Sequence, residues 1–187
     1  MHEGFILWFT GLSGAGKSTL SERLVSEFKS RGYRVELLDG DEVRTNLSKG
    51  LGFSREDRDT NIRRIGYVAH LLSRNGVAVI CSAISPYRQT RAEVRALVGD
   101  DAFIEVYADC PLEVCATRDG KVEMYAKARS GELKEFTGVS DPYEAPASPA
   151  VHLRTNAQTP QESAKAVLDY LASRSFIEPA ARVGSAS

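Results

Sequence analysis

The sequence predicts an α/β fold, in which a parallel central sheet carries helices on both faces in a three-layer αβα domain. Two kinds of segment alternate along the chain and support this prediction. Short, continuous apolar runs such as 5–9 (FILWF) and 77–81 (VAVIC) are typical of strands buried on both sides. Between the runs, apolar residues recur at helical spacing, as at Leu20, Leu24 and Phe28.

The expected elements follow one another without an internal repeat. Further strands are predicted at 34–38, 102–108 and 151–153, and helices at 17–30, 42–75 (divided near residue 51), 85 onward, 111–118, 122–130 and 161–171. Pro86 is expected in the first turn of the helix that opens at Ser85. Residues 1–176 are expected to form one domain, with a long loop over about 119–149 that acts as a lid. The small and polar residues 177–187 are expected to form a flexible tail.

The composition excludes several classes of protein. With 42% hydrophobic and 26% charged residues among 187, the chain is neither disordered nor collagen-like. A net charge of −1 indicates no general attraction to nucleic acid or to acidic lipid. No apolar run approaches the ~20 residues that span a bilayer, and no signal peptide is recognisable, so we expect a soluble cytoplasmic protein. The cysteines Cys81, Cys110 and Cys115 lack zinc-ligand spacing and are expected to be reduced thiols.

The first predicted strand runs directly into a phosphate-binding motif. Residues 11–18 match G-x-x-x-x-G-K-S without a mismatch, and an amphipathic helix follows. Glycines let backbone N–H groups turn toward phosphate oxygens, and the helix N-terminus adds partial positive charge. Lys17 is expected to reach the β- and γ-phosphates of ATP, and the Ser18 hydroxyl to ligate Mg²⁺. The fold is thus P-loop NTPase-like, and the expected nucleotide-binding residues are Gly11, Leu12, Ser13, Gly14, Ala15, Gly16, Lys17, Ser18 and Thr19.

Two carboxylates, Asp39 and Asp41, follow the second predicted strand. Because parallel strands end at the same edge of a sheet, both are expected beside the phosphate-binding loop. Phosphoryl transfer requires a metal ligand and a group that accepts the proton of the attacking hydroxyl, and either aspartate could serve. The third predicted strand ends in residues 81–83 (CSA) without an acidic residue, which favours these aspartates for the metal, with Asp39 as our candidate. The alternative is a plain turn in which Asp41 caps the next helix.

An arginine-rich stretch is the candidate for anion recognition. Arg58 and Asn61 lie three residues apart, on one face of a predicted helix, and Arg44 precedes them. A planar guanidinium donates two parallel hydrogen bonds to a sulfate or phosphate group. Acidic residues are interleaved with the arginines, which favours the alternative of a solvated surface.

Taken together, these segments resemble the adenylylsulfate kinase (APS kinase) family over about residues 4–171. The phosphate-binding motif is shared with many P-loop kinases, so the other segments carry the resemblance. They are 38–44 (LDGDEVR), 52–54 (GFS), 57–58 (DR), 61–66 (NIRRIG), 84–88 (ISPYR), 111–115 (PLEVC), 136–138 (FTG) and 141–146 (DPYEAP).

The resemblance implies an enzyme that transfers the γ-phosphoryl group of ATP to adenylyl sulfate, giving 3′-phosphoadenylyl sulfate in sulfate activation, with Mg²⁺ as cofactor. It implies that Arg118 packs against the adenine of ATP. The catalytic residues that it implies are Lys17, Asp39, Asp41 and Ser85. The residues that it implies for binding adenylyl sulfate are Asp41, Arg44, Phe53, Arg58, Asn61, Ile84, Ser85, Lys127, Lys134 and Phe136, with Phe53 and Phe136 on either side of the adenine.

Ser85 matches a serine that is commonly assigned as a phosphoserine intermediate in this family. No neighbouring His or Lys in the sequence is placed to activate it as a nucleophile. Direct in-line transfer needs no covalent intermediate. A role in capping the helix or in positioning the acceptor therefore stays open.

The predicted lid departs from the family pattern R-D-P-K-G-L-Y-K-K-A-R. Residues 118–129 read RDGKVEMYAKAR, with Gly120 in place of Pro, one extra residue, and Ala126 in place of the first Lys of the pair. The resemblance implies that Lys127, Lys134 and Phe136 close over both nucleotides and exclude water. The alternative is an ordinary mobile surface segment.

Two other functions stay open from the sequence. The first is a P-loop kinase for another small hydroxyl acceptor, such as a nucleoside, shikimate, gluconate or an antibiotic. The second is a nucleotide-binding domain without turnover that partners a sulfurylase. The family resemblance implies a homodimer, a possible association with ATP sulfurylase, and no nucleic acid or membrane partner.

Overall fold

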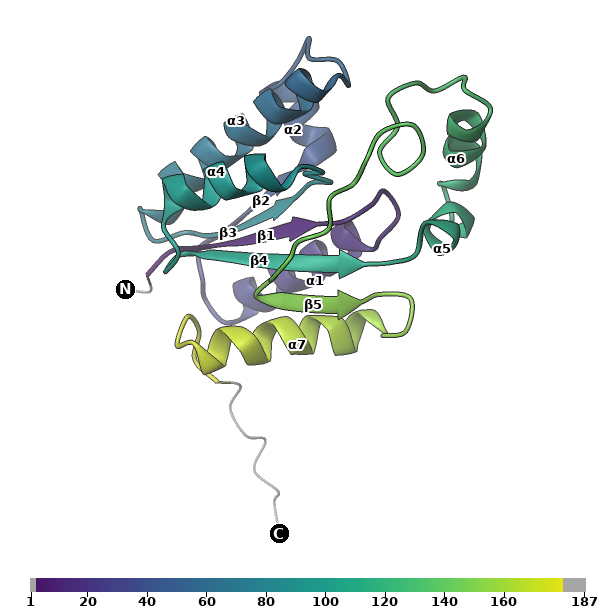
Figure 1. Ribbon diagram of the computed structural model, residues 1–187. Helices are drawn as coiled ribbons and strands as arrows, with labels where there is room; N and C mark the ends of the chain where they lie inside the picture. Colours follow the sequence, from purple (N-terminus) through teal and green to yellow (C-terminus); the bar gives the residue numbers. More distant parts are fainter. Residues whose placement is uncertain (1–2, 180–187) are drawn as a thin grey trace.

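The computed structural model describes residues 3–179 as a parallel sheet between two layers of helices, as predicted (Figure 1). The strand order is β2-β3-β1-β4-β5, and all neighbours pair in parallel. The strands are β1 (Phe5–Thr10), β2 (Val35–Asp39), β3 (Ala78–Ser82), β4 (Phe103–Asp109) and β5 (Val151–Arg154). The helices are α1 (Lys17–Ser30), α2 (Gly40–Asn46), α3 (Arg55–Ser73), α4 (Arg88–Val98), α5 (Leu112–Thr117), α6 (Val122–Arg129) and α7 (Pro160–Ser173).

The central strand β1 explains why its apolar run is continuous. Side chains alternate across a strand, so Phe5, Leu7 and Phe9 join the core beneath α1 and α7. Ile6 and Trp8 point the other way, into the core under α3 and α4. All six residues of β1 are buried, because both faces of the sheet are covered. In Figure 1, α1 and α7 lie on one side of the sheet and α3 and α4 on the other.

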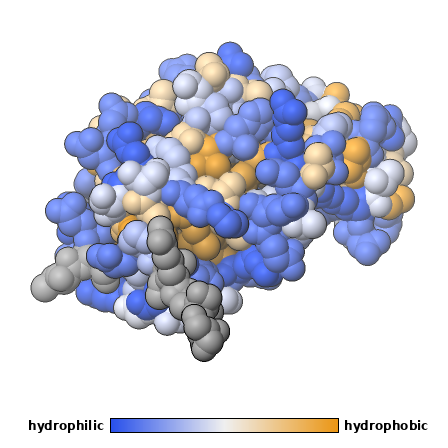
Figure 2. All heavy atoms as spheres, turned by 90° about the horizontal axis from the view of Figure 1, so that it is seen from below, coloured by the Kyte–Doolittle hydropathy of each residue, from blue (hydrophilic) through white to orange (hydrophobic). Residues whose placement is uncertain are grey.

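The outer helices carry polar residues toward solvent. The face in Figure 2, seen from below Figure 1, is mostly hydrophilic, and hydrophobic residues show only as broken patches. The helix α7, on this side of the molecule, begins with a capping box in which Thr159 and Glu162 exchange hydrogen bonds. No helix of residues 3–179 has the length and apolar character needed to cross a bilayer.

The ordered chain continues past residue 176, where the tail was predicted to begin. Ile177 is buried in the core beneath α1 and α7, and the Phe176 ring lies 5.4 Å from Phe5. The N–H of Glu178 donates to the Tyr33 hydroxyl at 3.2 Å. The rest of the predicted tail, 180–187, lies outside the described residues.

The helix predicted to open at Ser85 instead begins at Arg88. Tyr87 occupies the N-cap position without a side-chain cap, so Ser85 does not cap a helix. Ser85 has a φ of 40°, in the left-handed region that non-glycine residues rarely adopt. Its hydroxyl and carbonyl are held by other segments, described below, and these contacts override the helix signal of Pro86. The other predicted ends of helices and strands lie within two residues of those observed, except at the division near residue 51, where α2 ends at Asn46 and α3 begins at Arg55.

Candidate active site

The carboxyl ends of the strands meet at one edge of the sheet, and the predicted motifs follow them. The phosphate-binding loop follows β1, the two aspartates lie at the end of β2 and in α2, and residues 83–86 follow β3. The segment after β4 leads through α5 to α6, which lies in the lid beyond the same edge (Figure 1). In open parallel sheets this edge is where ligands bind.

The phosphate-binding loop depends on glycine at two turns. Gly14 and Gly16 have φ values of 81° and 92°, which L side chains rarely adopt. A Cβ on Gly14 would also lie 2.9 Å from the backbone oxygen of Cys115, where little can move. Gly16 stands at the N-cap of α1, so the first N–H groups of that helix open into the loop.

Lys17 is buried within this loop. Its Nζ donates to the carbonyl oxygens of Gly11 and Leu12, both at 2.8 Å. Burial is the main cause that lowers its pKa to about 8, while the carboxylates Asp39 and Asp41 oppose this shift. An anion entering the loop would restore the charge balance around Lys17, which suits the expected contact with phosphate.

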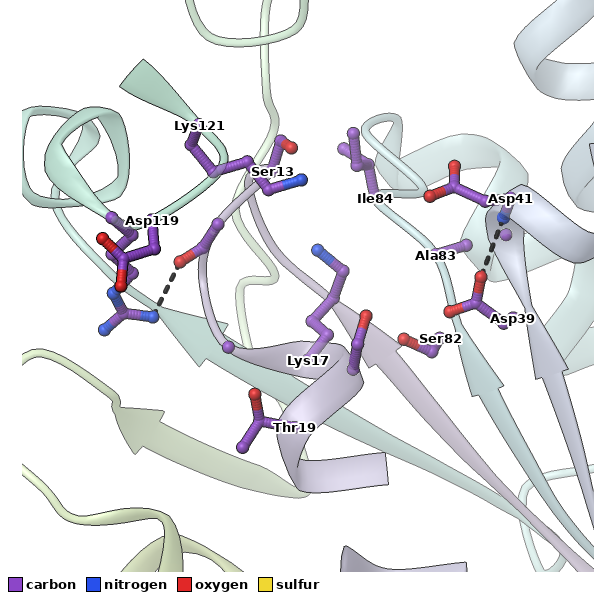
Figure 3. A pocket seen from close by; sticks show the side chains of 15 residues that line it. Ser13, Lys17, Thr19, Asp39, Asp41, Ser82, Ala83, Ile84, Asp119 and Lys121 are labelled. Carbon is purple, nitrogen blue, oxygen red and sulfur yellow. Dashed lines mark hydrogen bonds between the residues drawn. The ribbon is translucent and has the colours of Figure 1, made fainter. Parts of the chain in front are cut away.

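A cavity of about 350 Å³ opens between this loop and the ends of β2 and β3. Figure 3 shows Asp39 and Asp41 on one side of it, Asp119 and Lys121 on the other, and Lys17 between them. Ser82 also lines the cavity, and its buried Oγ has no hydrogen-bond partner in the described structure. The predicted nucleotide residues that line it are Ser13, Gly14, Gly16, Lys17, Ser18, Thr19 and Arg118.

The two aspartates have different surroundings. Asp39 is the N-cap of α2, and its Oδ1 accepts a hydrogen bond of 3.0 Å from the Asp41 N–H. The alternative in which Asp41 caps this helix is therefore wrong: the chain is still extended at Asp39, which places Asp39 in the cap position. Asp41 is exposed in the first turn of α2.

A second cavity, of about 150 Å³, adjoins the first. Gly40, Asp41, Ala83 and Ile84 line both cavities, so the two spaces meet along this wall. Seven of the residues predicted to bind adenylyl sulfate line the second cavity: Asp41, Arg44, Phe53, Arg58, Asn61, Ile84 and Ser85.

Asn61 and two arginines make this second cavity suitable for an anion that also carries a hydrogen-bond donor. The Oδ1 atom of Asn61 is buried without a hydrogen-bond partner in residues 3–179. Burial, and next the charge of Arg58, lowers the pKa of Arg44. Arg58 is itself buried and lies 3.8 Å from the Asp141 carboxylate.

The aromatic sandwich and the lysines predicted from the family pattern are not assembled in this structure. Phe53 is 54% exposed, and the Arg44 guanidinium lies 4.5 Å from the centre of its ring. Phe136 instead packs edge-on against Tyr125 in the lid, 5.0 Å away. Lys127 forms an ion pair with Glu123 at 2.7 Å. Of the described lid residues, Lys127, Lys134 and Phe136 line neither cavity.

Arg58 nevertheless links the second cavity to the lid. It donates from Nε to the Phe53 carbonyl at 2.8 Å and from Nη2 to the Glu135 carbonyl. Glu135 has a φ of 53°, a conformation that L side chains rarely adopt. The residue next to Phe136 is thus held directly at the cavity wall.

Arg118 borders a third cavity, of about 170 Å³, beside the first. Its Nη1 and Nη2 donate to the carbonyl oxygens of Gly14 at 2.7 Å and Thr155 at 2.8 Å, which fixes the plane of the guanidinium. Gln158 also lines this space, and its buried Oε1 has no partner in the described chain.

Several residues of these cavities were not predicted from the sequence. Lys121 and Asp119 lie in the R-D-x-K segment, so the family pattern carried a signal for them. Thr155 and Gln158 follow the short strand β5 and match no motif. Trp8 lines none of the three cavities, but from the core its Nε1 donates to the hydroxyl of the lining residue Ser85 at 3.1 Å.

Comparison with known proteins identifies the family. A family model described as adenylylsulphate kinase matches residues 3–154. This chain belongs to the adenylylsulphate kinase family. An adenylyl-sulfate kinase of Picosynechococcus is 56% identical over 178 residues, which cover 95% of this chain and 99% of the relative. The resemblance and the enzyme class predicted from the sequence, an ATP-dependent kinase, are confirmed.

Solved structures of the family share the fold. The Mycobacterium tuberculosis APS kinase CysC, in complex with AMPPNP and APS, is 42% identical with a TM-score of 0.85, over 91% of this chain and 99% of that one. A hexameric APS kinase from Thiobacillus denitrificans is 36% identical with a TM-score of 0.72, over 95% of this chain and 30% of that one. A probable bifunctional SAT/APS kinase of Sorangium cellulosum is 55% identical over 93% of this chain and 29% of the relative.

Proposed function

We propose that this kinase transfers the γ-phosphoryl group of ATP to the 3′-hydroxyl of adenylyl sulfate, and so forms 3′-phosphoadenylyl sulfate. The observation that carries the proposal is the shared wall of two cavities at Asp41 and Ile84. One cavity contains the phosphate-binding loop. The other contains two arginines and the Asn61 amide oxygen, which has no hydrogen-bond partner within residues 3–179. Phosphoryl transfer requires donor and acceptor in line at such a junction.

ATP is assigned to the first and third cavities. Its phosphates lie in the loop 11–18, where Lys17 exchanges the carbonyls of its own loop for phosphate oxygens. The adenine enters the cavity beside Arg118, whose anchored guanidinium provides a flat surface for stacking. Gln158 Oε1 is placed to accept a hydrogen bond from a donor on the ligand.

The residues of the first cavity also fit Mg²⁺. This ion takes one or two protein oxygens and completes its shell with water and phosphate. The Ser18 hydroxyl and the Asp39 carboxylate line one cavity. Ser82 lies opposite Asp39 on the neighbouring strand, and its buried Oγ has no hydrogen-bond partner among residues 3–179. Bound there, Mg²⁺ would neutralise charge on the transferred phosphoryl group.

Adenylyl sulfate is assigned to the second cavity. Arg44 and Arg58 bind its phosphate-sulfate group, and the Phe53 ring packs against its adenine. Asn61 Oδ1, which has no partner in the described part of the chain, accepts a hydrogen bond from the bound nucleotide. Recognition by charge, stacking and an amide oxygen distinguishes this acceptor from shikimate or gluconate, which carry no adenine.

Asp41 is assigned as the group that receives the proton of the attacking hydroxyl. It lines both cavities and is exposed, whereas one oxygen of Asp39 is occupied in capping α2. This placement separates the two roles: Asp39 serves the metal and Asp41 the acceptor. Ser85, on the acceptor side of the wall, contributes its hydroxyl as a hydrogen-bond donor.

The lid residues Lys127, Lys134 and Phe136 reach the nucleotides only when the lid moves inward. Phe136 would then leave Tyr125 and pair with Phe53 across the adenine. The contact of Arg58 with Glu135 holds this segment beside the second cavity, so Phe136 would need to move only a short way to reach the adenine. The division into one kinase domain over 1–176 with a lid over about 119–149 is part of the same proposal.

We also retain three proposals on the wider context. A homodimer is proposed from the family resemblance, and a cytoplasmic location from the composition. Association with an ATP sulfurylase is proposed because one relative, named bifunctional, extends well beyond the matched kinase region. Binding to nucleic acid or membranes is not proposed, since the net charge is only −1.

The test of the proposed function is ADP release with ATP and Mg²⁺, in which adenylyl sulfate is compared with AMP, shikimate, gluconate and water. We expect rapid turnover with adenylyl sulfate alone. Comparable ADP release with shikimate or gluconate would show that the acceptor is not an adenine nucleotide. Tight ATP binding without release for any acceptor would favour a domain without turnover.

A further inference from the structure

Arg91 joins three parts of the molecule that surround the acceptor cavity. It lies in α4, is 3% exposed, and donates through each of its three nitrogens. Nε donates to Glu105 Oε1 at 2.8 Å, Nη1 to the Ser85 carbonyl at 2.6 Å, and Nη2 to the Glu144 carbonyl at 2.7 Å. Because a guanidinium is planar and rigid, one group fixes the relative positions of all three partners.

The first partner is the turn that lines the acceptor cavity. Ser85 keeps its left-handed backbone because several groups hold it. Its carbonyl accepts from Arg91, its hydroxyl accepts from Trp8, and the Ile84 carbonyl accepts from Thr10 Oγ1 at 2.8 Å. The contact with Arg91 is charge-assisted, and such bonds are stronger than neutral ones.

The second partner is the segment by which the lid returns to the sheet. The Glu144 N–H donates to the Pro86 carbonyl at 2.8 Å, and Arg88 Nε donates to the Ala145 carbonyl at 2.6 Å. The Tyr143 hydroxyl contacts Thr10 Oγ1 at 2.9 Å. The C-terminal end of the lid is therefore fixed to the same turn that carries Ser85.

The third partner anchors this arrangement to the sheet. Glu105 belongs to β4 and is 8% exposed. Its other oxygen lies 3.6 Å from Nη2 of Arg95, one turn further along α4. Arg95 has no hydrogen bond to Ser85 or Glu144 among those described. It therefore serves as a matched control: it places a positive charge beside Glu105 but does not connect Glu105 to the other two partners.

We propose that Arg91 is a positioning residue that holds Ser85 and Ile84 at the acceptor cavity and fixes the C-terminal end of the lid against them. Lid closure and acceptor binding are then coupled through one guanidinium. This inference rests on the proposed function of the second cavity as the acceptor site. It assigns Arg91 no contact with either nucleotide.

The experiment compares Arg91→Lys with Arg95→Lys in the full chain. Lysine keeps the charge beside Glu105 but replaces the planar fork by a single compact ammonium with a shorter reach, so it cannot serve both carbonyls in the same geometry. We expect Arg91→Lys to lower kcat/KM for adenylyl sulfate about tenfold or more and to change KM for ATP less than about twofold. Arg95→Lys should resemble the wild type in both.

The chain contains one tryptophan, which supplies a second measurement that needs no turnover. Trp8 contacts Ser85, so its fluorescence should shift in ligand-free Arg91→Lys and stay unchanged in Arg95→Lys. Equal emission and equal kcat/KM in the two variants would overturn the proposal, and so would a parallel loss for ATP and adenylyl sulfate. If wild-type enzyme ignored adenylyl sulfate, the proposed function would fail while the fluorescence comparison still tested Arg91.

Arg88→Ala covers the case in which Arg91→Lys does not fold. Arg88 is exposed, and its replacement by alanine removes the side-chain hydrogen bond to the Ala145 carbonyl. We expect it to lower kcat/KM for adenylyl sulfate about threefold to tenfold, again with ATP unaffected. Wild-type kinetics for Arg88→Ala would count against an anchored lid end.

Discussion

The Nε1 atom of Trp8 lies 3.1 Å from the hydroxyl oxygen of Ser85 and donates a hydrogen bond to it. An indole N–H can only donate, so the Ser85 oxygen accepts and its own hydrogen stays available. A nucleophilic serine needs the opposite partner, a base that removes its proton. The contact therefore favours Ser85 as a donor toward the acceptor nucleotide.

Ser85→Ala is expected to fold and to retain measurable turnover, because direct transfer needs no phosphoserine. Loss of one hydrogen bond to a charged group should lower kcat/KM for adenylyl sulfate by about tenfold to a hundredfold. Steady-state kinetics measures this, and mass spectrometry of wild-type enzyme after turnover should find no phosphate on Ser85. Abolished activity in a folded variant, with phosphate on wild-type Ser85, would establish the covalent role instead.

Arg58→Ala is expected to weaken adenylyl sulfate binding at least about tenfold and to leave ATP binding unchanged. The reason is that Arg58 lines the acceptor cavity but neither of the two cavities assigned to ATP. Arg63→Ala is the matched control. Arg63 lies in the same helix α3 and pairs with Glu93 at 2.8 Å on the surface. Calorimetric titration with each nucleotide distinguishes them, and joint loss of both affinities in Arg58→Ala would remove it from the acceptor site.

The two aspartates should respond differently to removal of charge. Asp39→Asn is expected to raise the Mg²⁺ concentration needed for half-maximal rate, since a neutral amide is a weaker ligand for a hard cation. Asp41→Asn should keep that dependence and lower kcat by about a hundredfold or more, within the range typical of general base catalysis. Rates measured across Mg²⁺ concentrations test this, and reversed behaviour of the two variants would exchange their roles.

ATP binding should depend on pH through Lys17. Its pKa in the ligand-free protein is about 8, and bound phosphate should raise this value. The protonated form binds the anion, so affinity should be constant below pH 8 and weaken up to about tenfold per unit above it. Calorimetry in buffers of different ionisation enthalpy should detect proton uptake on binding just above pH 8. The same buffers should show none at pH 6, and absence of uptake at both pH values would contradict the assignment.

Gly66 allows α3 to approach α4 closely. A Cβ at this position would lie 2.7 Å from both γ-carbons of Val94. Gly66→Ala should therefore lower the free energy of unfolding by about 1–3 kcal/mol, despite the better helix propensity of alanine. Denaturant unfolding measures the effect. Adding Val94→Ala should recover part of the loss if the clash is the cause, and purely additive losses would argue against it.

Local patterns were sufficient for much of the fold. The strands β1 and β3 were predicted because each is a continuous apolar run, and α1 because its apolar residues recur on one face. The helix start at Ser85 was mispredicted because the signal at Pro86 is local, whereas Trp8 and Thr10 hold Ser85 from a distant strand. Ile177 was placed in a tail because most of the residues that follow it are small or polar, yet it packs beneath α1 and α7.

The candidate site divides in the same way. The loop 11–18 was predictable because every residue that forms it is contiguous and its glycines are needed by the backbone itself. Thr155 and Gln158 carry no pattern, because they reach the third cavity only once β5 pairs with β4. The departures of the lid from the family pattern did not indicate where its lysines would lie. In the structure Lys127 pairs with Glu123 and does not line the cavity that contains the phosphate-binding loop.

The sequence by itself determined the αβα class, the phosphate-binding loop, the aspartates after β2 and the family, since each is encoded by neighbouring residues. Only the tertiary structure decided that Asp41 and Ile84 form a wall between two cavities, and that Arg91 joins the turn at Ser85 to Glu144. The physical reason is sequence separation. A hydrogen bond between residues tens of positions apart depends on how the whole sheet orders its strands, and no local spacing records that order.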